Sequence, residues 1–289
     1  MWAEFKEKTY ETYFLAELAR LTNILYSPDQ IDEGELGFDG SFFLPSPVGR
    51  IAFPYVRFRR WRRLSGISAA EIDEFGAELN SHLPPFRLNL FVQYKRPQWL
   101  HQSNAIEWSS WSAPYFRYTI EAKQQGLLEN IVQAAAGRAA VVYAAAAFRL
   151  NSELFAHAEV GSVVPHSNIS SVEMLAGHER FTYIGPGSYG VAHSEPRAVE
   201  GPSLDGILAR MEGNEGLPFT KHMKLTFEAI QKAVGDDRKT LDLWEASRRA
   251  MIGGDLTEVY PRGRDSWIEA IISIAAFAQA FDIRVSAVG

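Results

Sequence analysis

The sequence predicts an α/β fold with a helical C-terminal part. In residues 88–97, apolar and polar side chains alternate, and aromatic and β-branched residues are frequent, as expected of a strand. Residues 122–136 have the spacing of an amphipathic helix, and residues 139–147 form the nearly continuous apolar run of a buried strand. A helix that links two strands of one sheet is the usual connection in α/β folds.

The length of the chain, 289 residues, allows one large domain or one domain with a smaller companion. We expect an α/β domain over residues 1–200, with an insertion around residues 45–86. Residues 201–289 are expected to be helical and either to dock on that domain or to form a dimer interface. Four segments there have helical periodicity, namely residues 203–211, 220–234, 241–251 and 265–281.

The composition excludes several classes of protein. A net charge of −6 argues against binding nucleic acid through overall charge, although a local basic patch is compatible with it. The absence of cysteine excludes disulfides, thiolate zinc sites and cysteine nucleophiles. No signal peptide is recognisable, and no apolar run approaches the roughly 18 residues that a membrane span requires. We therefore expect a cytoplasmic protein that does not contact a membrane.

An acidic stretch follows the first predicted helix. That helix covers residues 8–25, carries Glu11 and Glu17, and ends at the Tyr-Ser-Pro of residues 26–28. Four carboxylates lie in residues 31–40, and a short apolar run, expected to be a strand, begins at residue 41. Such carboxylates repel one another unless they are solvated or bind cations. The last of them, Asp39, is a candidate cation ligand, or alternatively a turn residue because Gly40 follows it. The four are Asp32, Glu33, Glu35 and Asp39.

A basic segment comes next and is the strongest charge asymmetry in the chain. Arginine side chains match phosphate oxygens, and the interleaved Phe58 and Trp61 are suited to stacking on bases. The alternative is a solvated basic strand that pairs with acids elsewhere. The arginines are Arg57, Arg59, Arg60, Arg62 and Arg63. A helix is predicted over residues 68–83, because Ser68 and Glu71 have the spacing of a capping box.

Gln93 and Lys95 are the candidate functional residues of the strand at 88–97. Because side chains alternate along a strand, both residues belong to one face of the sheet. Burying an unpaired ammonium is costly, so Lys95 is expected to have an anionic partner. The alternative is that both side chains face solvent while the apolar residues face inward.

Together, Asp39 and the Gln93-Tyr94-Lys95 triplet resemble the active site of the PD-(D/E)XK, or restriction-endonuclease-like, nucleases. Some branches of that superfamily, the Mrr-like enzymes among them, carry QxK in place of (D/E)xK. The resemblance implies a mixed central sheet flanked by helices, with Mg²⁺ or Mn²⁺ held by Asp39 and Gln93. Lys95 would act on water or phosphate, and Glu17 would be a further catalytic acid. A divalent cation suits this chemistry, because it neutralises developing charge and generates hydroxide.

The resemblance therefore predicts a magnesium-dependent endonuclease that hydrolyses phosphodiester bonds of DNA. Such single-chain bacterial nucleases often belong to restriction or antiviral defence systems, so a partner subunit of such a system is one expected partner besides DNA, and a second copy of the chain, in a homodimer, is another. The alternative is a catalytically inactive nuclease-fold module that binds nucleic acid or a partner protein. Glutamine in place of a carboxylate, and the long insertion between Asp39 and Gln93, favour that alternative.

The remaining part of the α/β domain carries weaker signals. Residues 114–121 and 176–184 are predicted strands, a helix begins at 151–155, and residues 162–166 are expected to be extended. Residues 185–190 match GxGxxG, but no helix pattern follows and no βαβ unit surrounds them, so we interpret them as a tight turn. His178 and His193 flank this turn without a zinc signature. They offer a third hypothesis, a hydrolase or transferase of unrelated mechanism.

Overall fold

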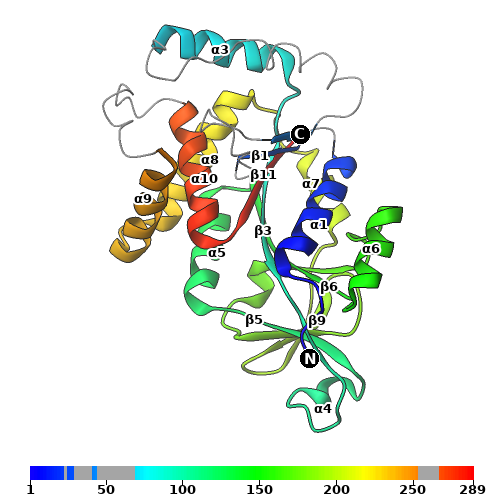
Figure 1. The fold of residues 1–289 in the computed structure, drawn as a ribbon. Helices are drawn as coiled ribbons and strands as arrows, with labels where there is room; N and C mark the ends of the chain where they lie inside the picture. The colour runs from blue at the N-terminus through cyan, green and yellow to red at the C-terminus, as the bar shows by residue number, and fades with distance from the viewer. Residues whose placement is uncertain (23–24, 29–40, 44–68, 253–266) are drawn as a thin grey trace. The chain divides into compact units, whose positions relative to one another are not determined.

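The computed structural model describes residues 1–22, 25–28, 41–43, 69–252 and 267–289 (Figure 1). Their fold is α/β, with flanking helices and a helical C-terminal part, as the sequence predicts. The strands form two β-sheets, whereas one mixed central sheet is expected from the sequence. Contacts between residues divide the chain into two compact units, each made of three segments. The first unit comprises residues 1–21, 92–132 and 140–210, and the second comprises residues 22–91, 133–139 and 211–289.

Most elements of the first unit are those that the sequence predicts. Its helices are α1 (Glu7–Leu21), α4 (Trp108–Trp111), α5 (Ala122–Ala134), α6 (Asn151–Val160), the 3₁₀ helix η1 (Val172–Leu175) and α7 (Leu204–Met211). Its strands are β4 (Gln98–Leu100), β5 (Tyr115–Thr119), β6 (Ala139–Ala146), β7 (Ser167–Ser171), β8 (Arg180–Tyr183), β9 (Tyr189–His193) and β10 (Arg197–Glu200). Strand β3 (Leu88–Lys95) begins in the second unit and ends in the first.

The smaller sheet is antiparallel and has the strand order β10-β9-β8-β5-β4. One of its faces is aromatic and buried, with Phe116 and Tyr118 of β5 against Phe181 and Tyr183 of β8. Because side chains alternate, Arg117, which pairs with Thr182 in the strand register, belongs to the opposite face. This second face is polar.

The larger sheet has the strand order β2-β1-β11-β3-β6-β7. The second unit contributes β1 (Leu25–Ser27), β2 (Ser41–Phe43) and β11 (Arg284–Val288), which pair antiparallel through β1. In the first unit, β6 and β7 also pair antiparallel. All residues of β6 from Val141 onward are buried, as the apolar run predicts.

The helices of the second unit are α3 (Ala69–His82), α8 (Phe219–Val234), α9 (Arg238–Ile252) and α10 (Trp267–Phe281). Helix α10 packs against both α8 and α9, as Figure 1 shows. Trp244 of α9 donates a hydrogen bond from Nε1 to the carbonyl of Ser273 on α10, at 2.7 Å. Trp267 and Phe219 bring their rings together at the start of α10 and α8. These contacts join α8, α9 and α10, which correspond to three of the four predicted helical segments.

Several predicted elements require correction. The first helix ends at Leu21 rather than at residue 25, and residues 25–27 form β1 because they pair with β11. Strand β11 itself was predicted as the end of the helical part. Residues 162–166 form a turn rather than an extended segment, and strand β7 follows directly. Strands β4, β9 and β10 have no predicted counterpart, since each is only three to five residues long.

The glycine-rich segment at 185–190 bends and leads into β9, which begins at Tyr189, and not into a helix. A Cβ atom at Gly190 would collide with the Phe181 ring and with the carbonyl oxygen of Thr182. Close packing between β8 and β9 therefore explains this glycine. Gly187 has a φ of +107°, a backbone conformation that favours glycine, which explains the glycine at this position as well.

No helix within the described ranges is both long enough and apolar enough to cross a membrane.

Candidate functional site

The end of strand β3 places Gln93 and Lys95 on one face. The opposite face carries Tyr94, whose ring lies 5.8 Å from that of Tyr10 and 5.4 Å from that of Phe14, both on α1. Gln93 is only 3% exposed, and Lys95 is half-buried. The structure thus brings the two side chains together on the face away from α1, and the alternative of a solvent-facing Gln93 is wrong.

Gln124, in the first turn of α5, links the two side chains. Its Nε2 donates a hydrogen bond to Gln93 Oε1, and its Oε1 accepts one from Lys95 Nζ at 3.4 Å. Lys95 Nζ also lies 5.5 Å from the centroid of the Tyr143 ring on β6, within cation–π distance. The lysine therefore contacts a neutral amide and an aromatic face.

Gln125, the next residue of α5, anchors the helix. It is buried, and its Oε1 accepts a hydrogen bond from the Tyr143 hydroxyl at 2.8 Å. Its Nε2 donates to Glu129 Oε1 at 2.6 Å and to the Val172 carbonyl at 2.8 Å. Burial raises the pKa of Tyr143 well above its ordinary value, and the carboxylates of Glu129 and Glu121 raise it further. The phenol therefore stays protonated as a hydrogen-bond donor.

The described side chains of this cluster do not by themselves fit a divalent cation. They offer two carboxamide oxygens, and both already accept hydrogen bonds: that of Gln93 from Gln124, and that of Gln124 from Lys95. Among all the described residues, no group of three or more His, Cys, Asp or Glu is placed to hold a metal ion. A cation here requires a carboxylate from beyond them, the role predicted for Asp39.

Two parts of the predicted site lie outside the residues that the structure describes. They are Asp39, with the acidic stretch around it, and the arginine segment from Arg57 to Arg63. Their roles stay predictions.

Glu17 is described and lies away from Gln93 and Lys95. It is 7% exposed, and its Oε2 accepts hydrogen bonds from the backbone amides of Val163 and Val164, at 2.7 and 3.2 Å. Helix α1 packs on the Tyr94 face of β3, whereas Gln93 and Lys95 belong to the other face. Glu17 therefore anchors the turn before β7 and is not grouped with Gln93 and Lys95. The alternative of an exposed helix glutamate is also wrong.

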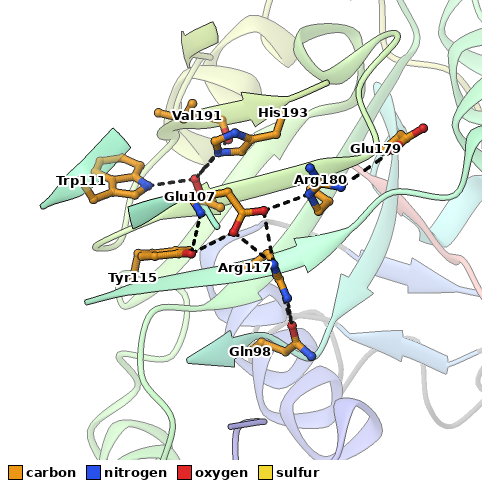
Figure 2. Close-up of polar contacts among 10 residues, drawn as sticks. Gln98, Glu107, Trp111, Tyr115, Arg117, Glu179, Arg180, Val191 and His193 are labelled. Atoms are coloured by element: carbon orange, nitrogen blue, oxygen red, sulfur yellow. Dashed lines mark hydrogen bonds and ion pairs between the residues drawn. The ribbon is translucent and has the colours of Figure 1, made fainter. Parts of the chain in front are cut away.

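A second polar cluster covers the polar face of the smaller sheet (Figure 2). At its centre is Glu107, whose side chain is 2% exposed. Its carboxylate pairs with Arg117 Nη1 at 3.1 Å and with Arg180 Nε at 3.0 Å, and accepts a hydrogen bond from the Tyr115 hydroxyl at 2.8 Å. Gln98 Oε1 accepts from the other nitrogens of Arg117, at 2.7 and 3.2 Å. We call this group the Glu107 cluster.

The electrostatics of the Glu107 cluster keep its central carboxylate ionised. Burial alone would raise the pKa of Glu107, but the Tyr115 hydrogen bond and the guanidinium groups of Arg117 and Arg180 together lower it below its ordinary value. Burial and the hydrogen bond to Glu107 raise the pKa of Tyr115 to about 12. The loop that carries Glu107 is therefore held on the sheet by an ion pair with two arginines.

Thr182 joins His193 to this cluster. Its hydroxyl accepts a hydrogen bond from Trp111 Nε1 at 2.9 Å and lies 2.9 Å from His193 Nε2 (Figure 2). Burial lowers the pKa of His193, so the imidazole is neutral at pH 7. Thr182 is fully buried, which makes its hydroxyl inaccessible to a substrate.

The hypothesis of a histidine-based hydrolase therefore gains no support at His193. His178 is half-buried, and its Nδ1 has no hydrogen-bond partner among the described residues.

No family model, no curated protein and no solved structure matches this chain.

Sequence reasoning missed Gln124 and Glu107. Gln124 has a usable signal, because it lies in the first turn of a helix that follows a strand and is one of two consecutive glutamines. Glu107 lies in a loop rich in tryptophan, and no local pattern pairs it with Arg180, 73 residues away.

Proposed function

We propose that this chain is a metal-dependent phosphodiesterase that acts on DNA, with Gln93 and Lys95 in its active site. One observation supports the proposal most directly: Gln93 and Lys95 meet at the end of β3, on one face, and Gln124 contacts both. The order of β3, helix α5 and buried strand β6 agrees with the core that the PD-(D/E)XK resemblance implies.

In this proposal each residue has a defined role. Lys95, half-buried and positively charged, would contact the scissile phosphate or the attacking water. Mg²⁺ or Mn²⁺, held by Asp39 and Gln93, would neutralise the charge that develops on the phosphate. The arginines from Arg57 to Arg63 would bind backbone phosphates and so position the duplex.

A second candidate is a module of the same fold that binds nucleic acid or a partner protein without cutting. The Gln93 amide favours it, because a carboxylate at this position would bind a cation more strongly. The engagement of Gln93 Oε1 by Gln124 favours it as well.

A cleavage assay separates the two candidates. Plasmid and linear DNA would be incubated with Mg²⁺ or Mn²⁺ and with the wild type, Asp39→Asn or Lys95→Met. Lys123→Met is the matched control, because Lys123 is an exposed lysine next to Gln124 on α5. We expect the wild type and the control to cut, and both site variants to lose at least about 100-fold in rate.

Two other outcomes have clear meanings. Cutting that survives both Asp39→Asn and Lys95→Met would refute the site. A wild type that binds DNA in a gel shift without cutting it would support the binding module, and Arg59→Ala and Arg60→Ala should then weaken that binding.

A further inference from the structure

We infer that Gln124 is a positioning residue of the proposed active site: it fixes the orientation of the Gln93 amide, and it holds the Lys95 ammonium. The inference rests on the proposed function for its catalytic consequence. Its structural part, the control of Gln93 and Lys95 by one side chain, is measurable whether or not the chain cuts DNA.

The hydrogen-bond directions carry the first step. A carboxamide has one accepting end and one donating end, and the two ends of Gln93 have different partners. Its Oε1 accepts from Gln124 Nε2, while its Nε2 donates to the carbonyl of Tyr94 at 3.3 Å. If the Gln93 amide were reversed, its NH₂ group would face the NH₂ group of Gln124. The Gln124 donor therefore keeps the Gln93 oxygen turned toward Gln124.

The second step concerns Lys95. Gln124 Oε1 accepts a hydrogen bond from its ammonium at 3.4 Å, and the Tyr143 ring lies 5.5 Å away on β6. An amide oxygen holds an ammonium without neutralising it. A carboxylate at position 124 would instead form an ion pair with the ammonium.

The position of Gln124 is itself fixed from the other side of the helix. Gln125 is buried and bonded to Tyr143, Glu129 and the Val172 carbonyl, so the first turn of α5 is anchored to β6 and η1. The two consecutive glutamines therefore have different contacts: Gln125 anchors α5, and Gln124 contacts β3.

Two substitutions separate the two contacts of Gln124. Gln124→Met has a similar length and removes both contacts. Gln124→Glu keeps an acceptor for Lys95 but has no donor for Gln93, and its charge raises the pKa of the ammonium. Gln133→Met is the matched control, because Gln133 is exposed and belongs to the same helix.

In cleavage kinetics, we expect Gln124→Met to lower kcat about 10- to 100-fold with KM nearly unchanged, because the catalytic groups lose their orientation. Gln124→Glu should lower kcat as well, and should move the alkaline limb of the pH profile to higher pH. The control should match the wild type. If Gln124 had a merely structural role, the pH profile would not shift in Gln124→Glu while it stays in place in Gln124→Met.

The second measurement needs no activity. The proteins would be treated with acetic anhydride, and acetylation of Lys95 would be followed by mass spectrometry. Loss of one hydrogen bond to the ammonium in Gln124→Met should speed this reaction about 2- to 10-fold, and Gln124→Glu should slow it. Unchanged Lys95 reactivity in both variants would overturn this inference, whereas a wild type that does not cut DNA would overturn the proposed function instead.

Discussion

Two buried polar clusters in the first unit are built from different chemistry. The Glu107 cluster has a carboxylate at its centre, with Arg117 and Arg180 paired to it at 3.1 and 3.0 Å. The cluster at the end of β3 joins the carboxamides of Gln93 and Gln124 to the ammonium of Lys95. In the first cluster opposite charges meet directly, and in the second a carboxamide oxygen accepts a hydrogen bond from an ammonium.

The difference indicates different uses. Hydrogen bonds between charged groups are the strong ones, and removing one partner of a buried pair leaves a charge uncompensated. The Glu107 cluster is thus suited to holding the loop of residues 101–113 on the sheet. Amide contacts are weaker but directional, so in the proposed function the cluster at β3 would orient Gln93 and Lys95. The following predictions test this contrast, beginning with the largest expected effect.

Glu107→Gln should cost about 2–4 kcal/mol of the free energy of unfolding at pH 7, because it leaves two arginines facing a neutral amide. This expected loss is smaller than that for breaking a fully buried ion pair, because the Arg180 side chain is 36% exposed. Urea unfolding of both proteins measures the difference. Glu179→Gln is the control, because Glu179 is 74% exposed and 3.9 Å from Arg180 Nη1, and it should change stability by less than about 0.5 kcal/mol.

The difference in stability between the wild type and Glu107→Gln should depend on pH. Because the pKa of Glu107 is lowered in the folded state, its stabilising effect is present above the pKa of an unfolded glutamate. The effect is lost as the pH falls through the lowered value, so the difference between wild type and Glu107→Gln should shrink in acid. A difference that stays constant from pH 7 to pH 3 would contradict the assignment of Glu107 as the ionised centre.

Thr182→Val tests the edge of the Glu107 cluster and should lower the free energy of unfolding by about 1–2 kcal/mol. Valine keeps the shape, but Trp111 Nε1 loses its acceptor and His193 loses the hydroxyl. Thermal unfolding and the fluorescence of the tryptophans report the loss of stability and of fixed packing. Thr119→Val is the control, since Thr119 is exposed on β5 and belongs to the same face of the smaller sheet. Equal stability of the two variants would show that the Thr182 hydroxyl contributes nothing.

Much of the fold is predictable, because its signals are local. Strand β3 alternates apolar and polar residues, and helices α3, α5 and α8 have clear apolar stripes. The missed elements are short and depend on distant partners: β1 forms because Leu25 pairs with Val288, which no local pattern reveals. Likewise, β9 is fixed by packing of Gly190 against β8.

The candidate site was predictable only along one strand. Period two places Gln93 and Lys95 together, as the structure shows, but which face meets which helix depends on tertiary packing. Tyr94 turns one face toward α1, so Glu17 lies apart from the pair although it was predicted to join it. Gln124 lies on the face of β3 that carries Gln93 and Lys95, and it is separated from them by 31 and 29 residues in the sequence.

Lys95→Met gives the smallest expected change in stability and the clearest test of the contrast between the clusters. A half-buried ammonium that is held by an amide and a ring contributes little net free energy, and methionine keeps its length and apolar stem. We therefore expect urea unfolding of Lys95→Met to differ from that of the wild type by less than about 1 kcal/mol, in either direction. If the variant instead loses as much stability as Glu107→Gln, the cluster at β3 is a stabilising element like the other. Its proposed role in presenting charge to a phosphate would then lose its physical basis, because Lys95 would be needed for the fold itself.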